Sequence, residues 1–187
     1  MGKIYFAQPV KLIISLITAD IKLFEFYKEI LIKKFYCIDL ESNIQPFIFT
    51  KYYENEFGKN LLQKLFSFKS LVKSEQLSEI KKITNNFENA FARNVSKGDL
   101  SVLKRKINID PGYISLDKFI LVSTKNGPAR IYIGNGIYAE ITLRFIDRTF
   151  IPCEYTYPNY KTEEYVNFLN IVRQKYKLQL KEYSSNF

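Results

Sequence analysis

The fold of this chain is decided by residues 130–145, RIYIGNGIYAEITLRF, in which apolar and polar side chains alternate. Such alternation, with a period of two, is typical of half-buried β-strands. The central GNG, residues 134–136, supplies residue types that accept a positive φ, so the segment predicts a hairpin with a three-residue loop. This loop pairs Arg130 with Glu140. A two-residue turn would instead place the apolar side chains of the two strands on opposite faces of the sheet.

The second arm of this hairpin continues as a strand with an apolar face and a polar face. The apolar face comprises Ile141, Leu143 and Phe145, and the polar face comprises Tyr138, Glu140, Thr142 and Arg144. Residues 147–148 predict a second hairpin into a strand over 150–157, and either of two three-residue loops makes the apolar faces of the two strands agree. Both loops place Glu154 on the same face as Glu140, directly opposite it in one and diagonal to it in the other.

The rest of the chain predicts a single α+β domain over residues 1–187, with a mixed or antiparallel sheet, a C-terminal β-meander and about three helices. Residues 10–18 are apolar on both faces and fit a central strand. Asp20 is placed to cap a helix over 21–36. Apolar periodicity predicts further helices from Ser74 onward and over 162–180, and strands are expected over 47–50 and 64–69. Residues 114–124 fit a helix or a strand, and a helix is favoured.

Composition excludes several classes of site. The 187 residues include no histidine and two cysteines, Cys37 and Cys153. Catalysis by a Ser-His-Asp or Cys-His pair is therefore excluded within this chain, and two cysteines are too few for a zinc site. Free thiols are typical of a reducing compartment. The apolar run over 12–19 is too short to span a bilayer, so we expect a cytoplasmic protein that does not enter a membrane.

The formal charge of +9 has two interpretations. A basic surface attracts nucleic acid or phosphorylated ligands. Lysine is also an ordinary solvating residue, and the basic residues are dispersed, with short clusters at Lys33-Lys34 and Lys104-Arg105-Lys106 and no run of five like charges.

The predicted sheet face carries the candidate site. Glu140 and Glu154, with Asp110 from a neighbouring element, are the candidate catalytic residues and the candidate ligands of a divalent hard cation such as Mg²⁺, and the two glutamates alternatively suit sugar hydroxyls. The candidate ligand-binding residues are Arg130 and Arg144 for a phosphate or carboxylate, Tyr132 and Tyr138 as a stacking wall, and Tyr113 and Glu54. The alternative is a solvated sheet face with a weak Arg130–Glu140 ion pair. Asp110-Pro111-Gly112 likewise fits a structural turn or a site.

Several motifs resemble the domain-of-unknown-function 4416 family of uncharacterised bacterial and archaeal proteins. They are NIDPGY at 108–113, IYIGNGIYAE at 131–140, YTYPNY at 155–160, PVKL at 9–12 and YYE at 52–54. The resemblance implies packing roles for Cys153 and Tyr155, where tryptophan is usual in the family, and it implies no reaction. Some relatives carry a GTP-binding label, but this sequence has neither the G-x-x-x-x-G-K-[ST] loop nor a base-recognition motif, so a P-loop GTPase is rejected.

Three classes of function remain. The first is an intracellular protein that binds a small anionic molecule or nucleotide phosphate, with or without a cation-dependent reaction. The second is a basic nucleic-acid-binding module that stacks bases on Tyr and Phe. The third is a non-catalytic assembly protein.

Overall fold

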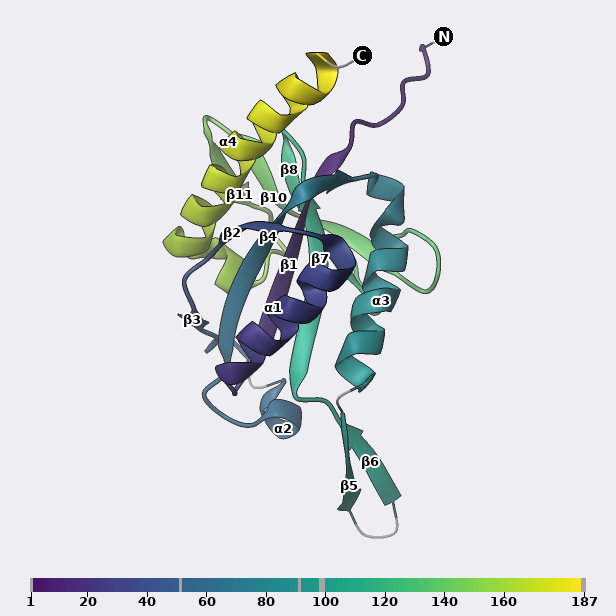
Figure 1. Ribbon diagram of the computed structural model, residues 1–187, viewed down its shortest axis with the longest axis vertical. Helices are drawn as coiled ribbons and strands as arrows, with labels where there is room; N and C mark the ends of the chain where they lie inside the picture. Colours follow the sequence, from purple (N-terminus) through teal and green to yellow (C-terminus); the bar gives the residue numbers. More distant parts are fainter. Residues whose placement is uncertain (1, 51, 91, 98–99, 186–187) are drawn as a thin grey trace.

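A computed structural model describes residues 2–50, 52–90, 92–97 and 100–185 and shows a single α+β domain. Within these residues a nine-stranded antiparallel sheet has the order β11-β10-β8-β7-β1-β4-β2, with β3 beside β4 and β9 beside β10 (Figure 1). Its strands are β1 (Val10–Thr18), β2 (Ile38–Glu41), β3 (Gln45–Pro46), β4 (Leu62–Val72), β7 (Ile107–Ile114), β8 (Lys118–Ser123), β9 (Ile131–Tyr132), β10 (Tyr138–Ile146) and β11 (Thr149–Pro152).

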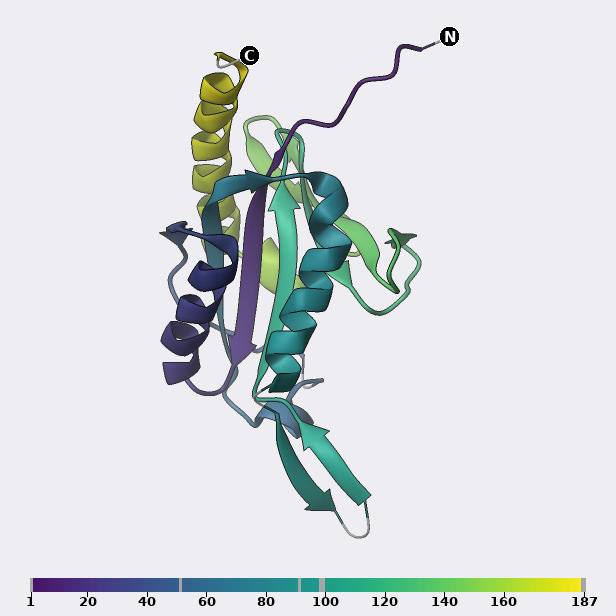
Figure 2. The same cartoon turned by 45° about the vertical axis from the view of Figure 1, so that its right-hand side comes forward.

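Helices cover both faces of this sheet. Three long helices are described, α1 (Lys22–Phe35), α3 (Leu77–Ala90) and α4 (Glu163–Ser185), together with the short α2 (Glu54–Phe57). Even-numbered residues of β1 pack with α1 and α3, and Ile13 packs with α4 on the opposite face. Because the strand is buried throughout, it is the central strand that the run over 10–18 predicts. Figure 2 shows α3 running beside β7.

The helical periodicities are confirmed. In α1 the stripe of Phe24, Tyr27 and Leu31 is buried, and the backbone N–H of Lys22 donates to Asp20 Oδ1 at 3.0 Å. This bond satisfies one of the amide groups that the first turn of a helix leaves unpaired. In α4 the stripe of Tyr165, Leu169, Val172 and Tyr176 is buried against the sheet.

The predicted register of the first C-terminal hairpin is also confirmed. Tyr132 pairs with Tyr138, and the backbone N–H of Ile133 donates to the carbonyl oxygen of Ile137 at 2.9 Å. Gly134, Asn135 and Gly136 all have positive φ, at 92°, 56° and 73°. The residue types of the loop therefore set the pairing of the strands that flank it.

The second hairpin differs from the prediction. Its loop has two residues, Asp147 and Arg148, with φ of 48° and 68°, and Ile146 pairs directly with Thr149. A β-bulge in β10, where the pairing with β8 shifts between Ile141 and Leu143, provides the extra residue that a three-residue loop was expected to supply. Consequently Ile141 does not share the apolar face of Leu143 and is 46% exposed.

Four further predictions are wrong. Residues 47–50 are not a strand: β3 ends at Pro46, and the apolar run buries Phe47 against Ile17 and Leu61 while Ile48 is exposed. Residues 114–124 are not a helix: β7 ends at Ile114 and β8 occupies Lys118–Ser123. Asp110-Pro111-Gly112 is not a turn, because it lies inside β7. The strand expected over 150–157 ends at Pro152. An unforeseen hairpin, β5 (Arg93–Lys97) and β6 (Leu100–Lys104), projects from the body below α3 (Figure 1).

Candidate functional site: a pocket where two strands part

The central feature of the candidate site is a gap between β7 and β8. The two strands pair from Gly112 to Ile114 of β7, whereas the first half of β7 pairs with β1 alone in the main sheet. A Cβ atom at Gly112 would lie 2.2 Å from the carbonyl oxygen of Ile120, so glycine is required where β8 approaches β7. Pro111 stands just before this junction. Its missing N–H costs no bond to β1, because N–H groups of odd-numbered residues here point away from that strand.

Side chains of α3 take the place of the missing strand along the open edge of β7. The backbone N–H of Ile109 donates to Glu88 Oε1 at 2.7 Å, and Lys81 Nζ donates to the Ile109 carbonyl oxygen at 2.8 Å. Residues 81 and 88 are seven positions apart, which places them on one face of a helix two turns apart. Both polar groups of Ile109 are therefore satisfied without β8, and this allows the sheet to stay open.

A pocket of about 540 Å³ occupies the region beside this edge. Its floor contains residues of β1, β4 and β7, including Gln63, Asn108 and Asp110. One wall is the polar face of α3, at residues 81, 85, 88 and 89, and the other wall is the end of β8 with Arg130 and Glu140. The aromatic side chains of Phe47, Tyr52 and Tyr53 close one end. This volume is within the range of small-molecule sites.

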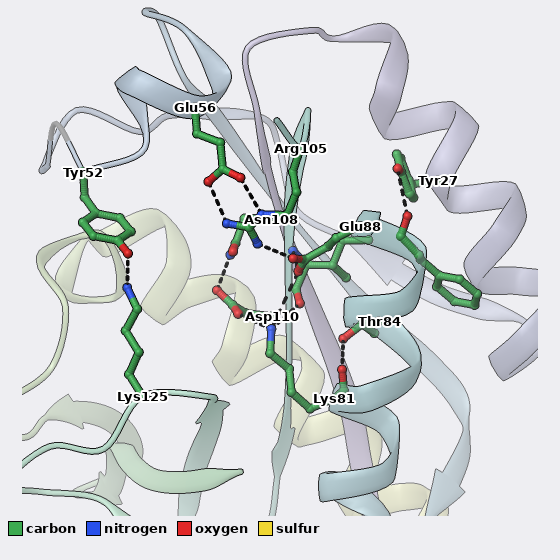
Figure 3. Close-up of polar contacts among 12 residues, drawn as sticks. Tyr27, Tyr52, Glu56, Lys81, Thr84, Glu88, Arg105, Asn108, Asp110 and Lys125 are labelled. Carbon is green, nitrogen blue, oxygen red and sulfur yellow. Dashed lines mark hydrogen bonds and ion pairs between the residues drawn. The ribbon is translucent and has the colours of Figure 1, made fainter. Parts of the chain in front are cut away.

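The wall nearest α3 is a network of ion pairs in which Lys81 and Glu88 are buried and the other members are partly buried (Figure 3). Lys81 Nζ lies 2.7 Å from Asp110 Oδ1, and the amide of Asn108 donates to the other oxygen of the same carboxylate. Arg105 donates through Nε and Nη2 to both oxygens of Glu56, at 2.7 and 2.8 Å, and through Nη1 to Glu88. Bidentate arginine–carboxylate pairs of this kind hold both partners in a fixed geometry.

Burial perturbs the titration of this wall. The pKa of Glu88 is raised by burial, which the Lys81 and Arg105 charges oppose without overcoming. Burial also raises the pKa of Tyr53 at the pocket end, with the Asp110 carboxylate adding to the effect. The pKa of Arg105 is raised by its hydrogen bond to Glu56. Perturbed groups gathered around one cavity are more typical of functional sites than of ordinary surfaces.

The predicted Arg130–Glu140 pair is present at the opposite wall. Arg130 Nε donates to Glu140 Oε2 at 2.8 Å, and Glu140 is 9% exposed. The guanidinium also donates to the Lys125 carbonyl oxygen and to the Tyr157 hydroxyl, each at 2.8 Å. Since Arg130 connects three segments, this is not the weak surface ion pair of the alternative interpretation.

Lys125 lies at the mouth of the pocket against Tyr52. Its Nζ is 3.8 Å from the centroid of the Tyr52 ring and donates to the hydroxyl of the same side chain (Figure 3). This contact joins the loop after β8 to the segment before α2, 73 residues apart. A cation on an aromatic face is attracted by the ring quadrupole.

A buried hydrogen-bond network supports the floor on the α4 side. Asn159 Nδ2 donates to Gln63 Oε1 at 2.9 Å, and Gln63 Nε2 donates to Ser15 Oγ at 2.7 Å and to the Tyr160 hydroxyl at 3.3 Å. Burial raises the pKa of Tyr160. These bonds fix the orientation of the amide groups that face the pocket.

The structure brings together three of the predicted site residues, Asp110, Arg130 and Glu140, from β7, the loop before β9, and β10. The others lie outside the pocket lining: Glu154, Tyr132, Tyr138, Arg144, Tyr113 and Glu54. Glu154 is exposed in a turn beyond β11, because that strand ends early. The Tyr132 and Tyr138 rings contact each other with centroids 5.3 Å apart.

Sequence reasoning missed the contribution of α3. A polar stripe runs beside the apolar stripe of α3 at helical spacing and comprises Lys81, Asn85, Glu88 and Asn89. This stripe is the sequence feature that indicates a polar wall on α3. The sequence marks Arg105 only as part of a basic cluster, whereas its side chain lines the pocket.

The predicted cation site is not supported by clustering of its ligands. Among the described residues there is no group of three or more Asp, Glu, Cys or His side chains placed to hold a metal ion. The carboxylates of the pocket are instead distributed among cationic partners.

Comparison with known proteins identifies the family. Residues 8–176 match the family model described as a domain of unknown function, DUF4416, so the chain belongs to that family. No curated protein and no solved structure shows a significant match. Within the described residues, no helix has the length and apolar character needed to cross a membrane.

Proposed function

We propose that this member of the DUF4416 family binds a small polar molecule with an anionic group in the pocket between β7 and β8. The supporting observation is that β8 leaves β7 and that charged side chains hold the sheet open around a cavity of about 540 Å³. Burying Lys81 and Glu88 has a desolvation cost that continued strand pairing would avoid. Such costs are typical of sites that serve binding or catalysis.

The chemistry of the lining supports a polar ligand. Arg130 and Lys125 provide cationic groups at one side, and Asp110 and Glu140 provide acceptors within. We place this binding in the cytoplasm, since the chain's two cysteines, Cys37 and Cys153, are free thiols. The dependence of binding on Mg²⁺ is measured separately, because each compound is assayed with and without the ion.

A thermal-shift screen tests the proposal with nucleotides, sugar phosphates and divalent ions, each alone and with Mg²⁺. We expect at least one anionic compound to raise the melting temperature of the wild type. Asp110→Asn and Glu140→Gln should reduce that shift, while Glu79→Gln on the exposed side of α3 should leave it unchanged. No stabilisation by any compound, or a shift that survives both pocket changes, would refute binding in this pocket.

The nucleic-acid alternative has less support from the geometry. Arg105, at the centre of the Lys104–Lys106 cluster, pairs with Glu56 and Glu88 and is not displayed to a nucleic-acid backbone. Fluorescence anisotropy with short RNA and DNA at two salt concentrations tests it, since backbone binding weakens steeply as salt rises. The assembly alternative is tested by mass measurement in solution.

A further inference from the structure

The ion pairs of the pocket distinguish one of its cations from the others. Three cations that line it have carboxylate partners within 4.0 Å: Lys81 with Asp110 and Glu88, Arg105 with Glu56 and Glu88, and Arg130 with Glu140. In the part of the chain that the structure describes, no carboxylate lies within that distance of Lys125 Nζ. An anionic group of a ligand therefore gains most at Lys125, where it need not displace a protein carboxylate.

Lys125 is also held in place at the mouth of the pocket. Its ammonium lies 3.8 Å from the centroid of the Tyr52 ring and donates to the Tyr52 hydroxyl, and its backbone carbonyl accepts a hydrogen bond from Arg130 Nη1 at 2.8 Å. Arg130 is in turn fixed by Glu140 and Tyr157. Because the lysine side chain is already restricted in the free protein, less side-chain conformational entropy is lost when a ligand binds.

The interior of the pocket has the opposite character. Asp110, Glu140 and Glu88 place carboxyl oxygens in the lining, each already paired with a protein cation, and these oxygens suit hydroxyl donors better than a phosphate. Asn85 and Asn89 of α3 add amide groups, each of which both donates and accepts hydrogen bonds. A neutral ligand body with several hydroxyl groups matches this lining, since each hydroxyl can donate to a carboxylate and accept from an amide.

Aromatic geometry disfavours a nucleobase as that body. Tyr53 stacks on Phe57, with an interplanar angle of 10° and centroids 5.3 Å apart, and Tyr52 meets Tyr53 edge-on at 5.0 Å. The Lys125 ammonium lies beside the Tyr52 hydroxyl, to which it donates. The Tyr53–Phe57 stack already uses a ring face that a stacked base would need.

Resting on the proposed function, we propose that the ligand is a phosphate monoester of a polyhydroxylated compound, in the class of sugar phosphates. Its phosphate contacts Lys125 at the mouth, and its hydroxyl groups bind Asp110 and Glu140 inside. Binding exchanges the Lys125–Tyr52 contact for a charge-assisted bond to phosphate.

Isothermal titration with ribose 5-phosphate and glucose 6-phosphate tests this assignment, beside the free sugars, inorganic phosphate and AMP. We expect at least one sugar phosphate to bind more tightly than its free sugar, than inorganic phosphate and than AMP. Lys125→Met should weaken that binding about ten- to hundredfold, the loss typical of one charged hydrogen bond. Lys118→Met is the matched control, because Lys118 lies at the other end of β8, outside the pocket lining, and should leave binding unchanged.

The outcomes separate this inference from the proposed function. Tighter binding of AMP, absence of binding by both sugar phosphates, or equal effects of Lys125→Met and Lys118→Met each overturn the ligand class. If another compound of the thermal-shift screen still binds and Asp110→Asn weakens it, the pocket proposal stands. If Asp110→Asn and Glu140→Gln leave all binding unchanged, the pocket itself is refuted.

Discussion

Removal of the Glu88 carboxylate should destabilise the protein far more than removal of an exposed glutamate on the same helix. Glu88 is 2% exposed, accepts the Ile109 N–H at 2.7 Å and pairs with Arg105. Glu88→Ala leaves that N–H without its acceptor beside the open edge of β7. It also deprives Arg105 and Lys81 of one carboxylate each, although Glu56 remains bound to Arg105 and Asp110 to Lys81.

The magnitude follows from these two losses. A buried donor left unsatisfied costs about 1–3 kcal/mol, and breaking a buried ion pair costs about 3–5 kcal/mol when no other partner remains. Because Glu56 keeps Arg105 paired, we expect a total near 3 kcal/mol for Glu88→Ala. At about 2–4 °C per kcal/mol for a chain of this size, the melting temperature should fall by roughly 6–12 °C.

Urea denaturation and calorimetry measure the effect, with Glu79→Ala as control. Glu79 is half-exposed, pairs with Lys82 at 3.4 Å and accepts an exposed hydrogen bond from Asn135 Nδ2 at 2.7 Å, so its loss should cost about 1 kcal/mol. Glu88→Gln keeps an oxygen for the Ile109 N–H and should fall between the two. If Glu88→Ala and Glu79→Ala destabilise equally, Glu88 does not support the open strand edge.

The same residue makes stability depend on pH in a defined direction. Burial raises the pKa of Glu88 above its ordinary value of 4.5, so between 4.5 and the raised value the folded state binds more protons than the unfolded state. The free energy of unfolding of the wild type, measured relative to Glu88→Gln, should therefore decrease as pH rises through that interval and then become constant. An increase over the interval would contradict the assigned shift.

Three shorter predictions concern the rest of the fold. Gly112→Ala places a Cβ 2.2 Å from the Ile120 carbonyl oxygen and should lower the free energy of unfolding by at least about 1–3 kcal/mol in urea denaturation; a neutral result would show that β8 can move away. Arg148→Gly should raise the melting temperature slightly, because Arg148 has a φ of 68° that glycine adopts without strain, and a lower melting temperature would count against this. Burial acts to raise the pKa of Asp39, but hydrogen bonds, including the one from Lys11, hold it below 3.8. The free energy of unfolding of the wild type should therefore exceed that of Asp39→Asn by a full margin above pH 3.8, and this margin should shrink as acid protonates the folded carboxyl. A margin unchanged in strong acid would refute that role.

The sequence alone was sufficient for elements whose pattern is local. Residues 10–18 read correctly as a central strand because both faces are apolar, and α4 follows from the spacing of Tyr165 through Tyr176. The register that brings Arg130 to Glu140 depends on the residue types of one short loop, which act over a few positions of the chain.

The predicted site was partly recovered for the same reason. Arg130 and Glu140 belong to one hairpin, so their meeting is a local matter. Asp110 was chosen from a motif that reads as a turn, yet Pro111-Gly112 marks the point inside β7 where β8 joins. Proline and glycine have the same local signature in a turn and at an irregular strand edge, so the pattern could not separate the two.

Only the tertiary structure decided which side chains share the pocket. Lys81 and Glu88 reach Ile109 because α3 packs along an edge of β7 that β8 leaves open. Neither the packing of α3 nor the departure of β8 can be predicted from the pattern of a few neighbouring residues. The bulge in β10 likewise turns Ile141 outward while keeping Glu140 buried, through pairing with a strand some twenty residues earlier in the chain. Local periodicity specifies which residues can share a face of a strand or helix. Long-range strand pairing and helix packing determine which faces meet, because those contacts depend on burial and hydrogen bonding across the whole domain.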